Sequence, residues 1–396
     1  MTNFALFVLV GRSLGPRGLG VVSVGFAAYL VPLVLQRAMV TDPLIVLQGS
    51  GNGMADPSAA AVMLSILLGC VVGSAYVLIG HLVRGSAYGL AVFGPWIPAA
   101  MLQDQWRYLS FKEGRGRHAA LNDATWAVAM SAALPLGLIF RTVGWQVAVW
   151  GVGAAAGAIV GFVQLRVRPG TVTETIRWWR RDAWRLAKWL GLDRIATMAG
   201  GQGAILLLAA ILRSADLGGL RAVQSVFAPL TLIGPAVVLP GLPAVRVAQA
   251  KSLRAGKRTA GRLSVIAVGL AVGYVVLLAP VRRTALGAVF GAAFERYAYL
   301  LFPVAVAQVA ISLGAGPVLL LKARMRMQEL VLGSFLGSAA GLIGAWLLGS
   351  AYGLGGAAWA LAFGATLSMV IVTWFAVVET ERPLGAVTEV SNELRS

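Results

Sequence analysis

Long apolar stretches recur along the whole chain and restrict its fold more than any other feature. Several exceed the roughly 18 residues that an α-helix needs to cross the hydrocarbon core of a bilayer. Of the 396 residues, 58% are hydrophobic and 12% are charged, whereas a soluble domain carries about 25% charged residues. A water-soluble fold of this size could not bury so many apolar side chains. The composition therefore excludes an ordinary soluble enzyme and predicts an all-α polytopic membrane protein.

The apolar runs predict about twelve transmembrane helices. The first run is too short to cross about 30 Å of hydrocarbon at about 1.5 Å per residue. We therefore expect a truncated first helix, and a start codon placed too far downstream is our preferred explanation. The predicted spans cover residues 4–11, 19–41, 58–83, 86–110, 118–140, 144–165, 192–212, 219–243, 262–281, 297–321, 328–349 and 354–379.

The basic residues predict the orientation of these spans. The chain carries 33 Lys and Arg against 15 Asp and Glu, a net charge of +18. With the N-terminus inside, 24 of the 33 basic residues fall in inner loops and the tail, and nine fall in outer loops. Basic loops stay on the cytoplasmic side, where they face anionic lipids. We expect both termini at the cytoplasmic face of a bacterial inner membrane, with anionic lipids and no nucleic acid as partners.

The longest predicted connection, residues 166–191, divides the chain into two halves. An N-terminal six-helix bundle, residues 1–165, precedes it. A C-terminal six-helix bundle, residues 192–380, follows it, and residues 381–396 form a predicted cytoplasmic tail. This arrangement predicts two domains of similar size joined by one linker.

The linker itself has the pattern of an amphipathic helix. Apolar residues recur at helical spacing, while its basic and interfacial aromatic residues are Arg177, Arg180, Arg181, Arg185, Lys188, Trp178 and Trp184. This pattern is typical of a helix that lies in the inner headgroup layer. Such a helix could be a lever between the bundles, a surface that gathers lipid-linked substrate, or a passive anchor.

The two halves also resemble each other in sequence. When the chain is shifted by 201 residues, positions 12–27 align with 213–228, and seven of these sixteen positions are identical. Each segment joins the first and second predicted spans of its half. Their equivalent positions predict parallel repeats related by an axis along the membrane normal, as in transporters that alternate access to a central site.

Charged residues near the inner ends of spans are candidates for substrate binding and gating. The planar guanidinium suits phosphate oxygens, and the candidate arginines are Arg37, Arg107, Arg194 and Arg246. Snorkelling to the interface is the alternative role for each. Asp104 shares a helix face with Arg107, and Asp123 lies across a predicted hairpin from it. We expect these carboxylates to form an inner gate or a structural salt bridge.

Glutamines are the polar candidates for contacts with sugar hydroxyls. A run at 200–203 containing three glycines interrupts the seventh span, and prolines crowd the eighth. Irregular backbone at membrane depth is tolerated where neighbouring protein or a water-filled cavity satisfies it. The candidates are Gln202, Gln224 and Gln308. Ordinary hydrogen bonding between helices is the alternative role for each.

Several motifs of other membrane functions are missing from the sequence. It has no phosphate-binding loop of the form Gly-x-x-x-x-Gly-Lys-Ser/Thr, and no His, Cys and carboxylate cluster has metal-ligand spacing. No acidic residue falls near the centre of a predicted span, which disfavours a cation-coupled exporter. We therefore expect no cofactor, no metal and no catalytic residue, and a protein that is not an enzyme.

Several segments are similar to those of a known transporter group. Residues 11–20 read Gly-Arg-Ser-Leu-Gly-Pro-Arg-Gly-Leu-Gly. The run 103–107 contains Gln-Asp and Arg, 122–126 begins with Asn-Asp and ends with Trp, and 220–225 runs towards Pro229. Together these resemble polysaccharide-export flippases, especially actinobacterial members. That group includes the O-antigen and teichoic-acid exporters of the multidrug/oligosaccharidyl-lipid/polysaccharide (MOP) superfamily, and the resemblance extends over both halves.

The resemblance implies a flippase that moves an undecaprenyl-pyrophosphate-linked saccharide, a polysaccharide precursor, from the inner to the outer leaflet of the cytoplasmic membrane. Its implied partners are that lipid-linked saccharide and polysaccharide-assembly enzymes. A negative-inside potential favours outward movement of an anionic headgroup by about 2.3 kcal/mol per charge per 100 mV. The alternatives are a multidrug-type small-molecule exporter, a lipid II flippase, and a membrane enzyme acting on the lipid carrier.

Overall fold

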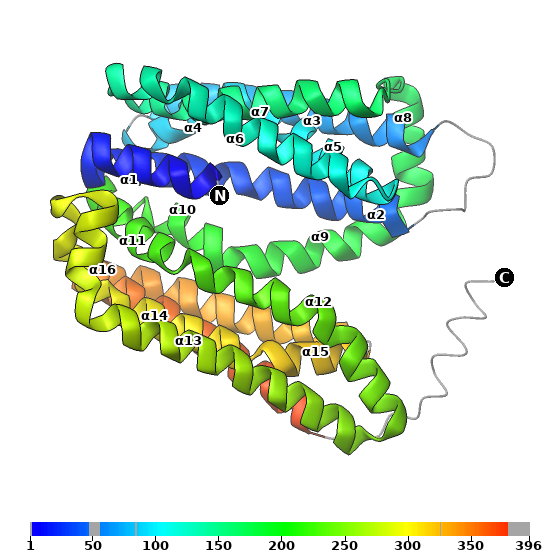
Figure 1. Cartoon of the computed structure of the whole chain (residues 1–396), viewed down its shortest axis with the longest axis vertical. Helices are drawn as coiled ribbons and strands as arrows, with labels where there is room; N and C mark the ends of the chain where they lie inside the picture. The colour runs from blue at the N-terminus through cyan, green and yellow to red at the C-terminus, as the bar shows by residue number, and fades with distance from the viewer. Residues whose placement is uncertain (1, 47–55, 84, 325, 379–396) are drawn as a thin grey trace.

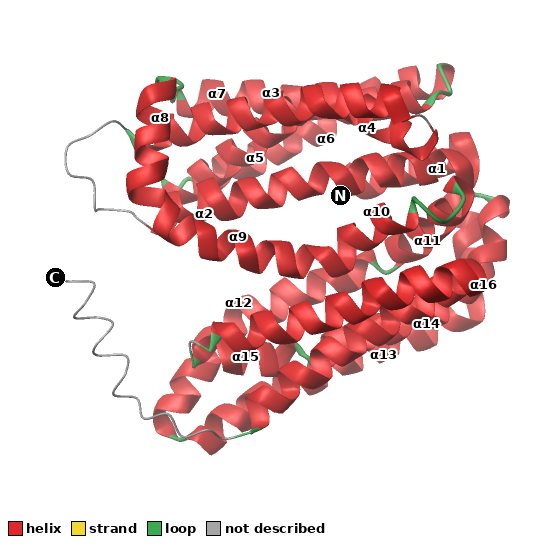
Figure 2. Cartoon of the chain, turned by 180° about the vertical axis from the view of Figure 1, so that it is seen from behind, coloured by secondary structure: helices red, strands yellow, loops and turns green. Residues whose placement is uncertain are grey.

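The computed structural model describes residues 2–46, 56–83, 85–324 and 326–378, which are helical almost throughout and contain no strand (Figure 2). The predicted tail at 381–396 lies outside these residues. In the first half the helices are α1 Thr2–Gln36, α2 Asp42–Val46, α3 Pro57–Val83, α4 Tyr88–Phe93, α5 Ile97–Lys112, α6 Gly116–Ile139 and α7 Val143–Leu165.

The second half begins with a linker helix and continues to the end of the described chain. Its helices are α8 Val172–Trp178, α9 Trp184–Met198, α10 Ala204–Leu208, α11 Ser214–Val226, α12 Ala228–Lys251, α13 Leu253–Phe290, α14 Leu301–Leu313, α15 Ala315–Ala323 and α16 Met327–Val377. A 3₁₀ segment, Ala292–Leu300, precedes α14. The predicted boundary at residue 191 falls inside α9, so the linker passes into the second half without a loop.

Two long helices are each divided by a glycine. Gly15 in α1 has φ 68° and Gly353 in α16 has φ 64°, and this left-handed region suits a residue without a Cβ. Among the described residues, six helical stretches are long and apolar enough to cross a membrane, and these two contain two legs each. With the shorter helices between them, the order of elements matches the predicted series of twelve spans. The all-α polytopic fold is therefore confirmed.

The two halves meet at one end of the molecule and diverge at the other (Figure 1). At the left of Figure 1, the second leg of α1 lies against α11. At the right, α9 stays in contact with α2 of the first half, whereas α12 and α15 lie apart from α2 and α9. Helix α8 runs across the helix ends on this diverging side. The C-terminal half thus leans away from the N-terminal half from one end of the bundle to the other.

The end where the halves meet is built from the repeated segments 12–27 and 213–228. Two glycines let the backbones touch: a Cβ at Gly20 would collide with the carbonyl of Ser214, and one at Gly218 with the carbonyl of Pro16. Such close backbone approach is the usual role of small residues between membrane helices. The sequence repeat therefore forms the contact between the two halves.

A second feature repeats between the halves at the level of side chains. In the first half, the hydroxyl of Tyr76 donates to the carbonyl of Ala28 at 3.0 Å. In the second half, the hydroxyl of Tyr274 donates to the carbonyl of Val226 at 2.6 Å. The two bonded residues are 48 positions apart in both cases. Equal bonds at equal spacing and in the same chain direction agree with the predicted parallel repeat.

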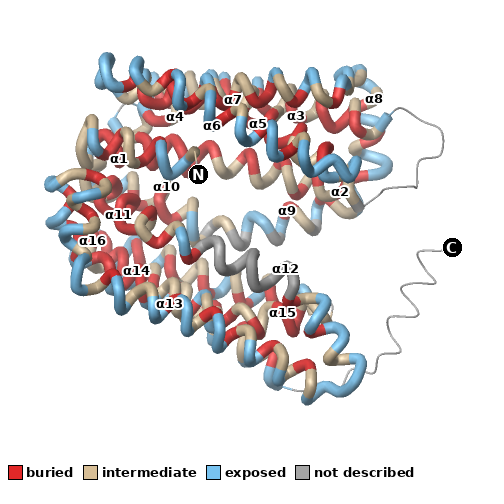
Figure 3. Tube along the Cα trace, in the orientation of Figure 1, coloured by how far each residue is buried: buried red, intermediate tan, exposed pale blue. Residues whose placement is uncertain are grey.

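Apolar side chains cover the outside of the helices as well as the core. Among many, Leu277 is 75% exposed and Trp374 is 66% exposed, and Figure 3 shows exposed residues along the outer sides of both bundles. A soluble monomer rarely exposes apolar surface on this scale. The outer faces are therefore suited to contact with lipid chains, and the polar chemistry must be sought between the halves.

Candidate functional site: a cavity between the halves

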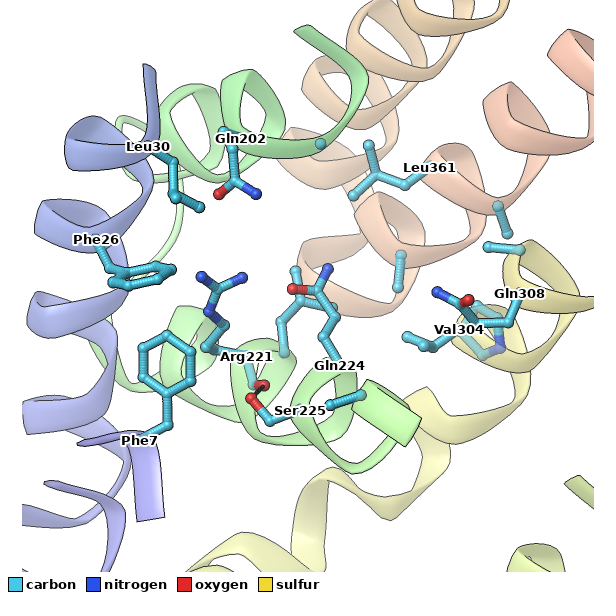
Figure 4. A pocket seen from close by; sticks show the side chains of 17 residues that line it. Phe7, Phe26, Leu30, Gln202, Arg221, Gln224, Ser225, Val304, Gln308 and Leu361 are labelled. Atoms are coloured by element: carbon cyan, nitrogen blue, oxygen red, sulfur yellow. Dashed lines mark hydrogen bonds between the residues drawn. The ribbon is translucent and has the colours of Figure 1, made fainter. Parts of the chain in front are cut away.

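A cavity of about 410 Å³ lies between the two halves (Figure 4). Seventeen described residues line it, and they come from α1, the turn before α10, α11, the start of α12, α14 and the second leg of α16. Most of the lining is apolar, with a few convergent polar groups. This composition is typical of a ligand-binding pocket.

Arg221 on α11 is the one charged residue among the described residues that line the cavity. Arg221 as a whole is only 9% exposed. Its guanidinium points into the open space of the cavity (Figure 4). No carboxylate of the described residues pairs with it, and its Nε has no hydrogen-bond partner there. A buried cation without a partner is costly, so this position is suited to an anionic ligand.

Two aromatic rings of the other half hold this guanidinium. The Cζ of Arg221 lies 4.6 Å from the ring centre of Phe7 and 5.2 Å from that of Phe26. The two rings pack edge to face with their centres 4.9 Å apart. Contacts of this kind attract a cation without neutralising its charge. Phe7 and Phe26 lie on the two legs of α1, so both halves are needed to build the site.

The local sequence explains how Arg221 reaches this position. Gly218 and Gly219 remove side chains where α11 meets Pro16 of α1 and the ring of Tyr297. Helix α11 can therefore lie against α1, and Arg221 follows one turn later on its buried face.

The three predicted glutamines all line the same cavity. Gln224 lies three positions after Arg221 on the same helix, α11. Gln308 comes from α14, and Gln202 comes from a π-helical turn at Ala199–Gly203. Gln202 Oε1 has no hydrogen-bond partner among the described residues. The predicted break in the seventh span is thus a widened turn, a feature often found at functional sites. Contact of these amides with sugar hydroxyls stays a prediction.

Arg37 forms a structural ion pair outside the cavity lining. Its Nε and Nη2 donate to the two carboxylate oxygens of Asp104 at 2.7 and 2.6 Å. Asp104 is buried, with 4% of its side chain exposed. Sequence spacing pointed to Arg107 as the partner of Asp104, whereas the structure pairs Asp104 with Arg37. A widened π-helical turn, Arg37–Thr41, turns the arginine towards α5.

Arg107 and Asp123 form a looser pair across the α5–α6 hairpin. Their closest N–O distance is 3.9 Å, and both side chains are at least a third exposed. Beside them, Gln103 donates to Asn122 Oδ1 at 2.6 Å and to Asp123 Oδ1 at 3.1 Å. Asn122 in turn donates to the carbonyl of Gly157 at 2.7 Å. These contacts join α5, α6 and α7, and a gating role for Asp104 and Asp123 stays a prediction.

The remaining two predicted phosphate-binding arginines lie outside the cavity lining. Arg194 is exposed on α9, and Arg246 is exposed near the end of α12. The structure does not bring the four predicted arginines together. It instead places Arg221, which sequence reasoning did not select, in the cavity between the halves.

A sequence signal for Arg221 did exist. It lies among apolar and small residues in α11, with no Asp or Glu within four positions on either side. An ionisable residue without a local partner inside a membrane segment is a functional candidate by default. The described residues also contain no group of three or more His, Cys, Asp and Glu that could hold a metal ion.

Solved structures of transporters share this fold. The chain matches a lipid II flippase MurJ in an inward closed conformation with a TM-score of 0.80 and 9% identity, over 95% of this chain and 85% of that one. An inward-facing MATE multidrug transporter of the MOP superfamily matches with 0.73 and 14% over 95% and 93%. An outward-facing MATE transporter matches with 0.62 and 13% over 95% and 91%. No known protein family and no curated protein matches the sequence.

The chain therefore has the fold of the MOP-superfamily transporters, over nearly its whole length. Its cavity lies between the two helical halves, as expected for a molecule that exposes one site alternately to two sides. What this cavity could bind must be judged from the residues that line it.

Proposed function

We propose that the protein flips a lipid-linked saccharide across the bacterial cytoplasmic membrane by alternating exposure of the central cavity. Arg221 carries this proposal, because a buried arginine without an acidic partner requires an anion to complete it. The phosphate linkage of the cargo is that anion, Gln202, Gln224 and Gln308 contact the saccharide, and the lipid tail stays in the bilayer.

The charge of the two ends supports a direction of loading. The diverging end carries the basic segments 112–118, 166–188, 251–262 and 322–326, and basic loops mark the cytoplasmic side. The halves are closed at the opposite end, where Gly20 and Gly218 meet α11 and α1. Of the matched structures, the inward closed MurJ scores 0.80 and the inward-facing MATE transporter 0.73, against 0.62 for the outward-facing MATE transporter, so both higher scores belong to inward conformations. Cargo therefore enters from the inner leaflet.

The linker supports a role at the same surface. Trp178 and Ala183 are buried against the first half, and Trp179 donates to the carbonyl of Met39 at 3.1 Å. The basic residues between them remain exposed, where they bind anionic lipids. We further propose that polysaccharide-assembly enzymes deliver the cargo here, and that the chain belongs with the polysaccharide exporters of the MOP superfamily.

The cavity disfavours the alternative of a cation-exporting multidrug transporter. Its lining offers one arginine and no carboxylate, so a cationic drug would be repelled from it. A lipid II flippase remains the nearest alternative, because lipid II is itself an anionic lipid-linked saccharide and the MurJ fold matches over most of both chains.

A flipping assay tests the proposal. The protein is reconstituted into liposomes with a fluorescent short-chain isoprenoid-linked saccharide, and dithionite then quenches the probe in the outer leaflet only. Active protein exposes the inner-leaflet probe, and we expect Arg221→Gln to slow this by about tenfold or more, the effect of losing at least 1.4 kcal/mol of binding. The matched control Arg283→Gln removes an exposed arginine outside the cavity and should keep the rate. Equal rates for Arg221→Gln and the unaltered protein would refute the role of the cavity.

A further inference from the structure

We infer that the cargo's linkage carries one negative charge, so that a phosphodiester rather than a diphosphate joins the lipid to the saccharide. This inference rests on the proposed function and adds the chemical class of the substrate. It departs from the diphosphate that the sequence resemblance implied. The observation behind it is the number of charges among the described residues that line the cavity.

Only one positive charge of the cavity is left to a ligand. Arg221 is the one ionisable side chain in the lining. Nearer the diverging end, Arg37 is neutralised by both oxygens of Asp104, and Arg107 faces Asp123 at 3.9 Å. The described residues of the lining thus present a net charge of +1 to whatever enters.

Charge matching in a mostly apolar site favours a monoanion. A phosphodiester ionises once, so its complex with Arg221 is neutral. A diphosphate that joins a lipid to a sugar carries two charges, and the second would stay unbalanced among apolar residues such as Val304 and Leu361. An uncompensated charge in a low-dielectric site is heavily penalised. The neutral glutamine amides can donate hydrogen bonds to the cargo but add no charge.

The geometry of the guanidinium gives the same answer. Phe7 and Phe26 lie beside it, and its free nitrogens point towards Gln202 and Gln224 (Figure 4). One planar fork binds two oxygens of a single phosphate in a bidentate manner. No second cation of the lining is placed to take the oxygens of a neighbouring phosphate.

A binding experiment with matched probes tests the charge. The full chain in nanodiscs is titrated with farnesyl phosphoryl glucose, farnesyl diphosphoryl glucose and short-chain phosphatidylglycerol, which is also a phosphodiester. We expect the phosphoryl glucose to bind at least about tenfold more tightly than the diphosphoryl glucose. Equal or tighter binding of the diphosphate probe would overturn the inference while leaving the proposed flippase intact.

Two substitutions sharpen the test. Gln224→Arg adds a second cation beside the first and should reverse the preference in favour of the diphosphate. Arg221→Lys keeps the charge without the fork and should retain the preference with weaker binding, whereas Arg283→Gln, at an exposed position outside the lining, should change neither. A preference that Gln224→Arg leaves unaltered would contradict charge matching.

Phosphatidylglycerol, the third probe, tests whether the bound phosphodiester belongs to a saccharide carrier or to an ordinary membrane lipid. Weak binding of phosphatidylglycerol supports the saccharide carrier. Binding of phosphatidylglycerol as tight as that of phosphoryl glucose would keep the single charge but overturn the saccharide cargo. Failure of all three probes to bind would overturn the proposed function together with the inference.

Discussion

Arg37 in the N-terminal half and Arg221 in the C-terminal half differ in what surrounds them. In the N-terminal half, Arg37 and Arg107 each face an aspartate. In the C-terminal half, Arg221 is as deeply buried as any of them but faces only aromatic rings and amides. A paired charge joins helices, whereas an unpaired charge is available to bind a ligand. The difference predicts opposite consequences of removing each arginine.

The largest expected effect comes from breaking the Arg37–Asp104 pair. Arg37→Gln leaves the carboxylate of Asp104 buried without a counter-charge, and we expect a loss of about 3 kcal/mol or more in the free energy of unfolding. Unfolding in mixed micelles, followed by tryptophan fluorescence, measures it. The double variant Arg37→Gln/Asp104→Asn should recover most of the loss, and equal damage in both would contradict a structural pair. Arg221→Gln should show the reverse pattern, with stability kept and transport lost.

A second test concerns the glycines where the halves meet. Gly218→Ala places a Cβ against the carbonyl of Pro16, so we expect overpacking to destabilise the closed end by about 1–3 kcal/mol. Site-directed spin labels at the ends of α1 and α11 would report a wider separation. Gly269→Ala is the control, because a Cβ there meets nothing within 4 Å. An unchanged separation in Gly218→Ala would show that this contact does not hold the halves together.

The repeated tyrosine bonds allow the two halves to be compared directly. Tyr76→Phe and Tyr274→Phe each remove one hydrogen bond to a backbone carbonyl, and we expect each to cost about 1 kcal/mol. The same unfolding measurement applies to both. If the two losses in the free energy of unfolding differ several-fold, the two bonds share their geometry but do not contribute equally to stability.

The smallest expected effect lies at the start of the linker helix. Hydrogen bonds from the hydroxyl and the backbone N–H of Thr171 to Glu174 lower the pKa of this carboxyl below its ordinary value of 4.5. The cap therefore stabilises α8 above pH 4.5 and weakens as the pH falls through the lowered pKa. Hydrogen exchange at the first turn of α8 should rise over that range, and Glu174→Gln should remove the pH dependence. If hydrogen exchange at the first turn of α8 did not depend on pH in the unaltered protein, the capping role of Glu174 would be wrong.

Much of the fold could be predicted because its signals are local. Hydrophobic length marks each span, basic residues mark the loops of one side, and the shifted identities mark the repeat. Gly15 shows where such signals end: the sequence placed a loop there, and the structure turns the chain at one residue with positive φ. The linker illustrates the same limit, since helix α9 continues through the expected boundary at 191.

The candidate site was harder to predict because its contacts join distant segments. Arg37 and Asp104 are 67 positions apart, and helix spacing alone suggested Arg107 for Asp104. The glutamines were recognised as polar groups near irregular spans, and all three line one cavity. The lack of a nearby acidic residue marks Arg221 as a candidate, but only the folded chain shows whether a distant carboxylate meets an arginine, as Asp104 meets Arg37.

Sequence alone thus determined that this chain crosses a membrane many times in two related halves, because hydrophobic length and charge placement act residue by residue along the helix. The tertiary structure decided which charges cancel. Packing of α1 against α11 places Arg221 between Phe7 and Phe26 and away from every described carboxylate. A net charge inside a cavity is a sum over neighbours in space, and that sum exists only after the helices have packed.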